Sequence, residues 1–436
     1  MNIANDRLLE LVFSNYNIWE QAIIDGDEKA IKHSVLKNVS DPIQREELKQ
    51  QLIDHTYHIK PPHEAHIPKD DGTMRTVYAN EADDRVLLTV INNIFFKYCP
   101  EMIHHNCVSY QTGIGCGKID KAVVNKIRHT KTLPDKLGYK IDLSKYFDSV
   151  PIEYIDKVFD DIEHKFGPSC ILDLVREYYH DDTLLDIDRN EIHKYTSLRQ
   201  GCAIAAFLAN AVLFDIDKTI SKYNVVYCRY SDDILIIGVD ADIAYFKISE
   251  MLNARSLVLN PKKIEILTKD KWFTFLGFSI RGQQITLSKK RIKNLQHEIE
   301  KRTIKRKNKK KADIGTIIRS VYIYLYDTAV TKYGYADGIL PIINCDEDIR
   351  QFDLFIMDCI RASITGKTRI GGLGYDKNGK NGVITRGKGR HVHTNREKIP
   401  HIKNYTTLKH MQNLFINDRE AYTAYVKELI VSPIES

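Results

Sequence analysis

The chain has 436 residues, with 64 Lys and Arg against 58 Asp and Glu, so its formal net charge is +6. Hydrophobic residues make up 43% and charged residues 28%, which excludes a mainly disordered or fibrous chain and allows a packed core in about two to four structural units. No stretch approaches the roughly 20 apolar residues that cross a bilayer, and the first residues lack a secretion signal, so we expect a soluble, cytoplasmic protein without a membrane partner.

The small net charge conceals a strong asymmetry along the chain. Residues 289–311 carry twelve Lys or Arg and two Glu, and residues 366–402 carry nine Lys or Arg and two acids. The two stretches sum to +17, so the remainder sums to −11. A single basic run is usually a solvated face, but two runs on an acidic remainder favour a polyanionic partner such as nucleic acid.

The N-terminal part of the sequence predicts helices followed by a hairpin. Residues 1–60 have apolar positions at helical spacing and read as a helical extension. Ile67–Tyr78 predicts a hairpin with Asp71-Gly72 as its turn, and a helix over 83–98 follows.

Further elements follow in chain order. Tyr139–Leu143 predicts a strand, and helical patterns run from Pro151 to about Tyr179. Gln200–Ile220 predicts one apolar helix rich in small residues, and Val225–Gly238 predicts two strands around a polar turn. We then expect a helix (241–253), a strand (258–267), a hairpin (272–287), basic helices from 288, a Gly/Lys-rich loop (366–390) and a last amphipathic segment (405–431).

Two carboxylate positions carry the strongest chemical signal. Tyr230-Ser231-Asp232-Asp233 predicts a turn with adjacent carboxylates between buried strands, where negative charge is unfavourable unless a cation binds. Asp142 ends another strand and supplies a third carboxylate. Mg²⁺ prefers such oxygens together with substrate phosphates, and two ions about 3.5–4 Å apart suit in-line phosphoryl transfer. The alternatives are a plain turn and a strand-end cap.

The ordered set of motifs resembles the palm of reverse transcriptases over about residues 60 to 285. KIDLSKYFDSV resembles their first catalytic motif, RQGCAIAAFLAN the helix that contacts template and nucleotide, and YSDD the metal-binding hairpin. LNPKKIEIL and FLGF resemble the two motifs that close the palm. The resemblance implies an RNA-directed DNA polymerase.

It also implies an α+β, right-hand polymerase fold, with fingers, an RRM-like palm with an antiparallel sheet, and a helical thumb. The corresponding regions are an N-terminal helical extension (1–60), fingers (61–138 and 151–197), palm (139–150 and 198–287), basic helical thumb (288–365), and a Gly/Lys-rich loop with a C-terminal helical segment (366–436).

The resemblance gives individual residues roles. Asp142, Asp232 and Asp233 would be catalytic and, with Leu143, would hold two Mg²⁺ ions. Phe147 sits where the family keeps an aromatic gate against the ribose 2′-hydroxyl, which implies dNTPs; the alternative is a core Phe.

Other residues would contact the incoming nucleotide. Lys69 and Arg75 would grip its triphosphate, and Gln200 and Gly201 would approach the nascent base pair. Lys263 would assist departure of pyrophosphate, with Lys262 as the alternative.

Nucleic-acid contacts would come from the hairpin tyrosine, the primer-grip residues and the basic helix. These are Tyr230, Phe275, Leu276, Gly277, Lys289, Lys290, Arg291, Arg302, Lys305 and Arg306. Isolated, the three primer-grip residues fit a plain β-hairpin almost as well.

Two features depart from a simple match. Tyr179-His180-Asp181-Asp182 also fits Tyr-x-Asp-Asp, but it follows a helical run and precedes Gln200, so we interpret it as a solvated helix end. Ala205-Ala206 stands where the family usually has Ser-Pro, which removes a hydroxyl and a helix-starting proline and puts template handling in doubt.

The kind of reverse transcriptase is inferred from layout. The sequence lacks the Val-Thr-Gly signature of retron enzymes, the Ser-Gln of diversity-generating ones and further nuclease motifs. What remains resembles bacterial antiphage-defence reverse transcriptases, which implies a structured noncoding RNA as template, cDNA as product and dNTPs as substrates. A retron-like or diversity-generating enzyme, an RNA-dependent RNA polymerase and a silent RNA-binding scaffold stay open as alternatives.

Overall fold

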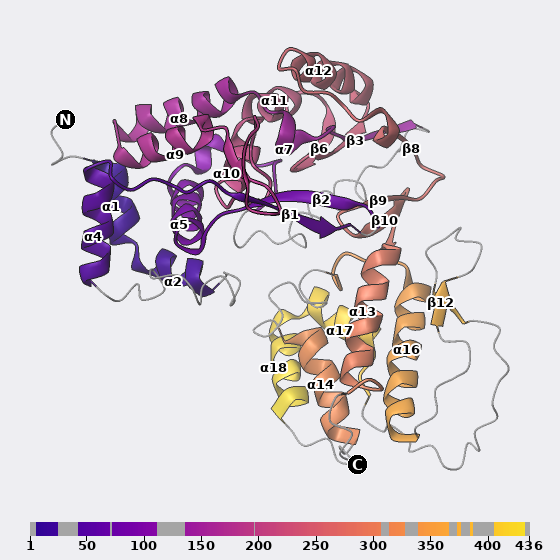
Figure 1. Ribbon diagram of the computed structural model, residues 1–436. Helices are drawn as coiled ribbons and strands as arrows, with labels where there is room; N and C mark the ends of the chain where they lie inside the picture. Colours follow the sequence, from indigo (N-terminus) through magenta and orange to yellow (C-terminus); the bar gives the residue numbers. More distant parts are fainter. Residues whose placement is uncertain are drawn as a thin grey trace. The chain divides into compact units, whose positions relative to one another are not determined.

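A computed structural model describes residues 6–24, 42–69, 72–110, 136–195, 197–306, 314–327, 339–365, 373–375, 384–386 and 405–431. Helices and sheets alternate along these ranges, so the expected α+β class is confirmed (Figure 1). The chain divides into two compact units. The first comprises Met1–Gln111 with Tyr139–Glu265, and the second comprises Thr112–Gly138 with Ile266–Ser436.

The first unit begins with the predicted helices. They are α1 (Arg7–Ser14), α2 (Tyr16–Ile24), α4 (Pro42–Ile53) and α5 (Ala82–Tyr98), and α5 packs against both α1 and α2. The Asp6 carboxylate caps α1 by accepting a hydrogen bond from the Leu9 amide at 2.9 Å. The Trp19 indole is buried and donates to the Val12 carbonyl at 2.7 Å, which fixes α2 against α1.

The predicted hairpin is confirmed and belongs to a small sheet. Strands β1 (His63–Pro68) and β2 (Met74–Ala79) pair antiparallel, and β4 (Thr183–Leu185) and β5 (Glu191–His193) extend the sheet in the order β2-β1-β4-β5. Gly72 has φ +83°, and its amide donates to the Lys69 carbonyl. Asp71, the other predicted turn residue, lies outside the described residues.

Two amphipathic helices follow the predicted strand β3 (Lys136–Asp142) and the short helix α7 (Tyr146–Ser149). Helices α8 (Ile152–Phe166) and α9 (Cys170–His180) pack side by side, as Figure 1 shows. On α8 the buried positions are Ile155, Val158, Phe159, Ile162 and Phe166, the i, i+3, i+4 spacing of one helical face.

The central sheet of the first unit contains the carboxylate positions. Its strand order is β6-β7-β3-β8, with β6 (Val225–Tyr230) and β7 (Asp233–Gly238), and β8 (Glu265–Thr268) begins at the last residue of the unit. β6 and β7 form the predicted hairpin, antiparallel from Val225 opposite Gly238 to Tyr230 opposite Asp233. Helix α12 (Ala241–Asn253) is as predicted and packs on β7.

The prediction of one helix over Gln200–Ile220 is wrong. The segment forms α10 (Ala205–Ala211) and α11 (Phe214–Ile220), and Gln200 and Gly201 precede the first of them. The break is stabilised by two arginines that take over carbonyl groups at the end of α10. Arg229 donates to the Ala209 and Asn210 carbonyls, and Arg255 donates to the Val212 carbonyl.

The prediction of a strand over 258–267 is also wrong in extent. Pro261 has no amide to donate, and Asn260 caps a short 3₁₀ turn, η4 (Pro261–Lys263), by accepting from the Lys262 amide at 3.1 Å. A single bridge between Leu143 and Leu259 precedes this turn, and regular pairing begins only at Glu265.

In the second unit, three strands replace the single hairpin predicted over 272–287. β9 (Phe273–Phe275), β10 (Phe278–Arg281) and β11 (Gln284–Leu287) form a meander in the order β11-β10-β9. The first turn is Leu276-Gly277, both with positive φ, as a tight two-residue hairpin turn requires. Gly282, φ +53°, begins the second turn.

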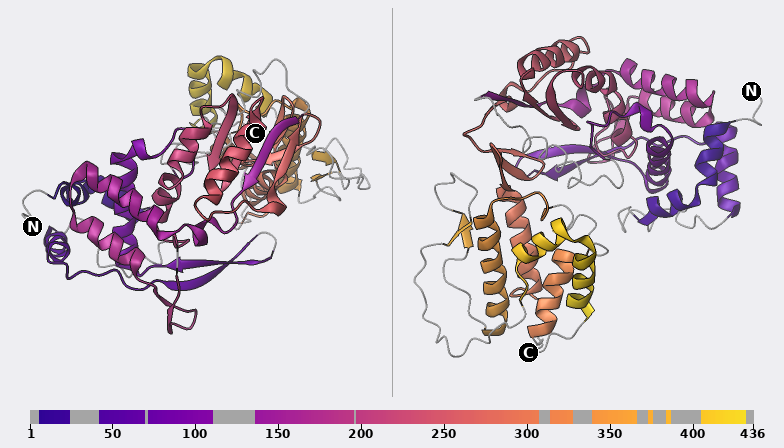
Figure 2. Two further views of the ribbon diagram at one scale, coloured as in Figure 1. Left: turned by 90° about the horizontal axis from the view of Figure 1, so that it is seen from above. Right: turned by 180° about the vertical axis from the view of Figure 1, so that it is seen from behind.

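Helices form the rest of the second unit. They are α13 (Lys289–Arg302), α14 (Ile314–Tyr326), α16 (Asp346–Thr365), α17 (Leu408–Asn417) and α18 (Arg419–Val431). Figures 1 and 2 show them as one bundle, and α14 packs against α13, α16 and α18. Within the predicted Gly/Lys-rich loop, β12 (Leu373–Tyr375) pairs antiparallel with β13 (Ile384–Arg386), and the rest of that loop lies outside the described residues. None of the helices in the described ranges has the length and apolar character that a bilayer crossing needs.

Candidate active site

The three predicted carboxylates lie on neighbouring strands of the central sheet. Asp142 is the last residue of β3, Asp233 is the first residue of the adjacent β7, and Asp232 lies in the turn before it. The Leu143 amide donates to the Asp232 carbonyl at 3.1 Å, which ties the end of β3 to the turn. Leu143, predicted among the metal positions, is therefore beside the turn, and its side chain is buried.

The environment of the turn opposes negative charge. Burial raises the pKa of Asp233 to about 6; the Asp142 and Asp232 carboxylates add to the rise and the Lys140 ammonium offsets it. Burial, followed by the Asp142 charge, likewise raises the pKa of Asp232. Three negative carboxylates that repel one another at a partly buried position indicate a site for a bound cation.

One carboxylate oxygen of the site has no hydrogen-bond donor. Asp233 Oδ1 is buried without a hydrogen bond, and Lys140 Nζ, 3.8 Å away, makes a charge contact too long to be one. A buried acceptor of this kind fits a hard divalent cation such as Mg²⁺, which prefers carboxylate oxygens. Within the described ranges, no three His, Cys, Asp or Glu side chains are already grouped as metal ligands.

Lys263 forms an ion pair with the Asp142 carboxylate. Its ammonium lies 2.9 Å from Oδ1 and 2.8 Å from Oδ2, and η4 presents it to the end of β3. The Asn260 amide fixes this approach by donating to the Asp142 carbonyl at 2.8 Å. Lys263 is thus the lysine of the Lys262-Lys263 pair that contacts a carboxylate of the site.

An open pocket of about 620 Å³ lies over these groups, within the size range of small-molecule sites. Its lining residues are Lys140, Asp142, Asp233, Lys262, Lys263, Ile264 and Glu265. Three lysines and three acids converge there, so the pocket combines groups for phosphate with groups for a cation.

The β1–β2 hairpin places one of the residues predicted to bind the triphosphate close enough to the site to affect its charges. Arg75 is exposed, and its charge lowers the pKa of Asp232 against the effect of burial. Lys69 is exposed at the start of the turn.

Gln200 and Gly201 join this hairpin rather than a helix. The Tyr78 amide donates to the Gln200 carbonyl at 2.7 Å. Gly201 has φ +105°, and a Cβ there would lie 3.0 Å from the Tyr78 carbonyl oxygen. The glycine therefore permits close approach to β2.

Phe147 and Tyr230 both have partly accessible rings. Phe147 lies in α7, packs edge-on to Tyr146 at 5.7 Å between centroids and is half-buried. Tyr230 ends β6, and its ring lies 6.0 Å from that of Tyr110.

The sequence analysis missed a buried polar network under the turn. Asp217 and Arg229 have fully buried side chains and form a bidentate ion pair, and the Tyr227 hydroxyl donates to Asp217 Oδ1 at 2.6 Å. Arg229 was readable as a charged residue within a buried strand pattern, the kind of position that requires a partner. Its partner lies twelve residues away on another element, which local periodicity does not show.

The second Tyr-x-Asp-Asp sequence ends a helix, as predicted. Asp181 caps the C-terminus of α9, and its side chain accepts from the Thr183 amide at 2.9 Å. The Asp182 carboxylate is 61% exposed and pairs with His193. These contacts make Asp181 and Asp182 a solvated helix end.

The primer-grip residues predicted in the second unit form a turn next to α13. Phe275 is buried, and Leu276 and Gly277 form the β9–β10 turn. The Arg291 guanidinium lies 4.6 Å from the Phe278 ring centroid and also lies beside Gly277.

The predicted basic residues of α13 and of the turn that follows it differ in their exposure and contacts. Lys289 and Lys290 are exposed. Arg302 pairs with Glu298 and stacks on Tyr324, and Lys305 pairs with Glu300. Arg306 is partly buried.

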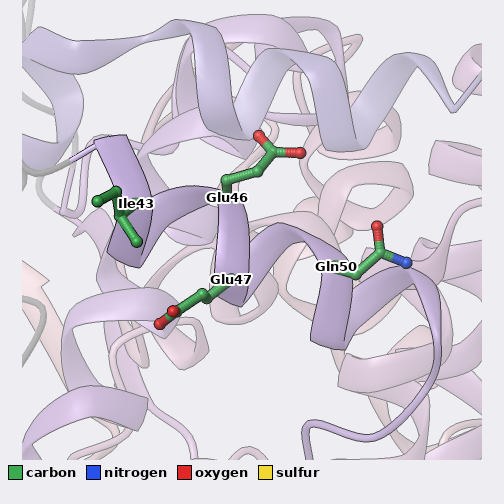
Figure 3. A pocket seen from close by; sticks show the side chains of 4 residues that line it. All are labelled: Ile43, Glu46, Glu47 and Gln50. Atoms are coloured by element: carbon green, nitrogen blue, oxygen red, sulfur yellow. The ribbon is translucent and has the colours of Figure 1, made fainter.

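A separate hollow lies on α4, lined by Ile43, Glu46, Glu47 and Gln50 (Figure 3). All four side chains come from one helix, and none of the predicted site residues is among them. Of the two hollows, the one over the central sheet is therefore the candidate site.

Comparisons with known proteins agree with this geometry. Residues 67–280 match the family described as "Reverse transcriptase (RNA-dependent DNA polymerase)". The chain is 26% identical over 211 residues to the "Retron Ec48 reverse transcriptase" of Escherichia coli, covering 46% of this chain and 47% of that protein. The match thus spans about half the length of this curated relative.

Two solved telomerases are more distant. One, from Candida albicans in complex with a TWJ fragment of telomeric RNA, has a TM-score of 0.39 and 10% identity, covering 72% of this chain and 60% of that one. The other, apo telomerase from Candida tropicalis truncated from its C-terminal domain, has a TM-score of 0.42 and 12% identity, covering 56% and 60%.

The family match includes the strand that ends at Asp142, the Ser231-Asp232 turn and the η4 lysines. It confirms the expected right-hand polymerase class and the expected RNA-directed DNA polymerase domain, because these define the family that the motifs resemble. Residues 67–280 therefore form a reverse transcriptase domain by their match to this family.

Proposed function

We propose that this chain is an RNA-directed DNA polymerase that copies a structured noncoding RNA into cDNA in the bacterial cytoplasm, as part of antiviral defence. The observation that supports it most is the carboxylate cluster on adjacent strands, in which Asp142 and Asp232 add to the raised pKa of Asp233. A cluster of carboxylates that lie close together although they repel one another is typical of a catalytic site.

In the proposed reaction, the 3′-hydroxyl of a primer attacks the α-phosphate of a dNTP, the phosphodiester bond forms and pyrophosphate leaves. Asp142, Asp232 and Asp233 are the residues that would hold Mg²⁺, which when bound would neutralise their charge and polarise the phosphate oxygens. Arg75 would bind the triphosphate as a bidentate donor, because its exposed side chain already acts on Asp232. Lys263, released from Asp142, would pair with the leaving pyrophosphate.

The proposed RNA partner is supported by charge. Helix α13 has exposed Lys289 and Lys290 at its start, and each phosphate contact by such residues adds salt-dependent affinity. The second candidate is a retron-type enzyme, which the similarity to the Escherichia coli retron reverse transcriptase favours. Both candidates share the polymerase chemistry and differ in the RNA that is copied.

The deciding experiment is to purify the protein from cells that carry its native flanking DNA and to sequence the bound RNA and DNA for wild type and Asp233→Asn. One enriched small RNA in both samples, with complementary DNA in the wild type alone, supports the proposal and identifies the template. Heterogeneous RNA without cDNA in either sample instead supports an RNA-binding scaffold that has no catalytic activity.

A primer-extension assay with dNTPs and NTPs offered separately tests the substrate. Extension with dNTPs alone supports reverse transcription. Extension with NTPs alone would indicate an RNA-dependent RNA polymerase that uses the same carboxylates.

A further inference from the structure

The backbone of the carboxylate turn is held in a conformation that its own sequence does not favour. Ser231 has φ +57°, in the left-handed region, where a residue with a side chain is strained by roughly 1–3 kcal/mol. Such strain persists only where the surroundings fix the backbone. Ser231 directly precedes Asp232 and Asp233, so its conformation sets the direction of both carboxylates.

Every polar group of Ser231 has a hydrogen-bond partner. Its amide donates to Ser109 Oγ at 3.0 Å, its carbonyl accepts from Arg229 at 3.2 Å, and its hydroxyl accepts from the Tyr110 hydroxyl at 3.2 Å. The Ser109 and Ser231 side chains are almost fully buried, so water cannot replace these bonds.

Ser109 in turn is fixed by helix α10. Its hydroxyl donates to Asn210 Oδ1 at 2.6 Å, and the Asn210 amide donates back to the Ser109 carbonyl at 2.7 Å. Since the Ser109 hydroxyl has a single proton, its donation to Asn210 leaves an oxygen lone pair directed to the Ser231 amide. The chain Asn210–Ser109–Ser231 therefore connects a buried helix to the catalytic turn.

We infer that Ser109 is a positioning residue for the proposed polymerase reaction: it holds the Ser231 backbone so that Asp232 and Asp233 face the substrate. This inference rests on the proposed function for its kinetic part only. The contribution is geometric, because the Ser109 hydroxyl bonds to the turn and to α10 and to none of the three carboxylates. Small displacements of catalytic groups reduce turnover strongly, by up to about 100-fold for 1 Å.

The test is Ser109→Ala, with Cys107→Ala as the matched control. The Cys107 thiol is equally buried, donates to Asn210 Oδ1 at 3.1 Å and lies 3.6 Å from Ser109 Oγ. Both variants thus lose one buried contact to the same amide, and Ser109→Ala alone also loses the bond to the turn.

In steady-state dNTP incorporation, we expect Ser109→Ala to lower kcat by about 10- to 100-fold. The KM for dNTP and the affinity for template–primer should change by less than about twofold, as for loss of a transition-state interaction. Cys107→Ala should keep kcat within about twofold of wild type. A kcat for Ser109→Ala equal to that of Cys107→Ala would overturn the inference.

Amide hydrogen exchange of the peptide that contains Ser231 is a readout independent of activity. We expect faster exchange there in Ser109→Ala than in wild type or Cys107→Ala. If exchange is unchanged, Ser109 does not hold the turn and the inference fails, whatever the kinetics. If exchange increases while neither wild type nor variant incorporates dNTPs, the structural part stands and the proposed function fails.

Tyr110→Phe covers the case in which Ser109→Ala does not fold. It removes a single oxygen from a side chain that is 41% exposed, so we expect this variant to fold. Loss of its bond to Ser231 should lower kcat by about two- to tenfold and leave KM unchanged. An unaltered kcat in Tyr110→Phe, together with a misfolded Ser109→Ala, would count against the positioning role.

Discussion

The Arg229 guanidinium and the Asp217 carboxylate form a bidentate ion pair in which neither side chain is exposed to solvent. Nε lies 2.8 Å from Oδ1, and the second contact is 2.6 Å. The same guanidinium donates to the Ser231 carbonyl, so a buried charge pair supports the turn from below. The pair links α11 to β6 within the first unit.

We expect Asp217→Asn to lower the free energy of unfolding by about 3–5 kcal/mol, because Arg229 would keep its charge without a buried counter-charge. Chemical denaturation measures this loss. Asp160→Asn is the control, since Asp160 pairs with Arg176 at 2.9 Å on the surface and is 55% exposed. A loss below about 1 kcal/mol is expected there, and equal losses would contradict the importance of burial.

Asp232→Asn should lower dNTP incorporation by about 1000-fold, since loss of a metal ligand removes several kcal/mol of transition-state stabilisation. RNA affinity, measured by filter binding, should stay within about twofold. Asp182→Asn is the control because it changes the other Tyr-x-Asp-Asp sequence, at the end of α9, and should leave incorporation intact. Persistent synthesis by Asp232→Asn would show that the metal site is assigned wrongly.

Phe147→Ala tests the sugar gate. If the accessible part of the ring excludes a 2′-hydroxyl, its removal should raise NTP use relative to dNTP use by about 10- to 100-fold, as measured by the ratio of kcat/KM values. Phe159→Ala, a fully buried core change on α8, should lower the melting temperature without altering that ratio. A constant ratio in both variants would make Phe147 a core residue.

Gly201→Ala should destabilise the protein by more than Gly167→Ala. Both glycines have positive φ, +105° and +89°, so both variants suffer backbone strain. Only at Gly201 would the new Cβ meet backbone atoms, since nothing lies within 4 Å at Gly167. We expect the free energy of unfolding to fall by about 1–3 kcal/mol more in Gly201→Ala than in Gly167→Ala, as measured by thermal or chemical unfolding. Equal losses would mean that β2 shifts to make room for the new Cβ.

Asp353 should make stability depend on pH in the second unit. Burial raises its pKa to about 6, against about 3.9 in an unfolded chain, so the folded state binds more protons between these values. The stabilisation is therefore complete below about pH 4 and is lost as pH rises towards 6.

Asp353→Asn provides the comparison. Asparagine keeps an oxygen acceptor for the Leu408 amide and the Tyr405 hydroxyl, which now bond to Asp353. We expect the wild type to lose about 2 kcal/mol relative to this variant between pH 4 and 6, measured by chemical denaturation. Parallel pH profiles would rule out Asp353 as the source.

The sequence was informative where local rules decide the structure. The β6–β7 hairpin, helix α12 and the helix end at Asp181 were all predictable, because period, turn residues and polarity agree there. The three carboxylates were predictable as one site, because each lies at the end of a predicted strand and Mg²⁺ needs such oxygens together.

It was misleading where distant groups override local preference. The α10–α11 break depends on Arg229 and Arg255, which approach from other elements and bond to carbonyls that a continuous helix would use itself. The partners of Ser109 and Asp217 are likewise set by tertiary packing, and a single sequence contains no signal for such pairs. The short strand at 265–268 reflects Pro261, which has no amide to donate to a neighbouring strand.

The segment before Tyr110 has one more consequence. β6 is the outer strand of the four-stranded sheet, and on its free side the Arg229 amide donates to the Asn106 carbonyl while the Val108 amide donates to the Arg229 carbonyl. An outer strand with unpaired backbone groups is a template for edge-to-edge association of chains. By occupying the backbone groups of Arg229, residues 106–108 block this end of the β-prone strand Val225–Tyr230 from pairing with another chain.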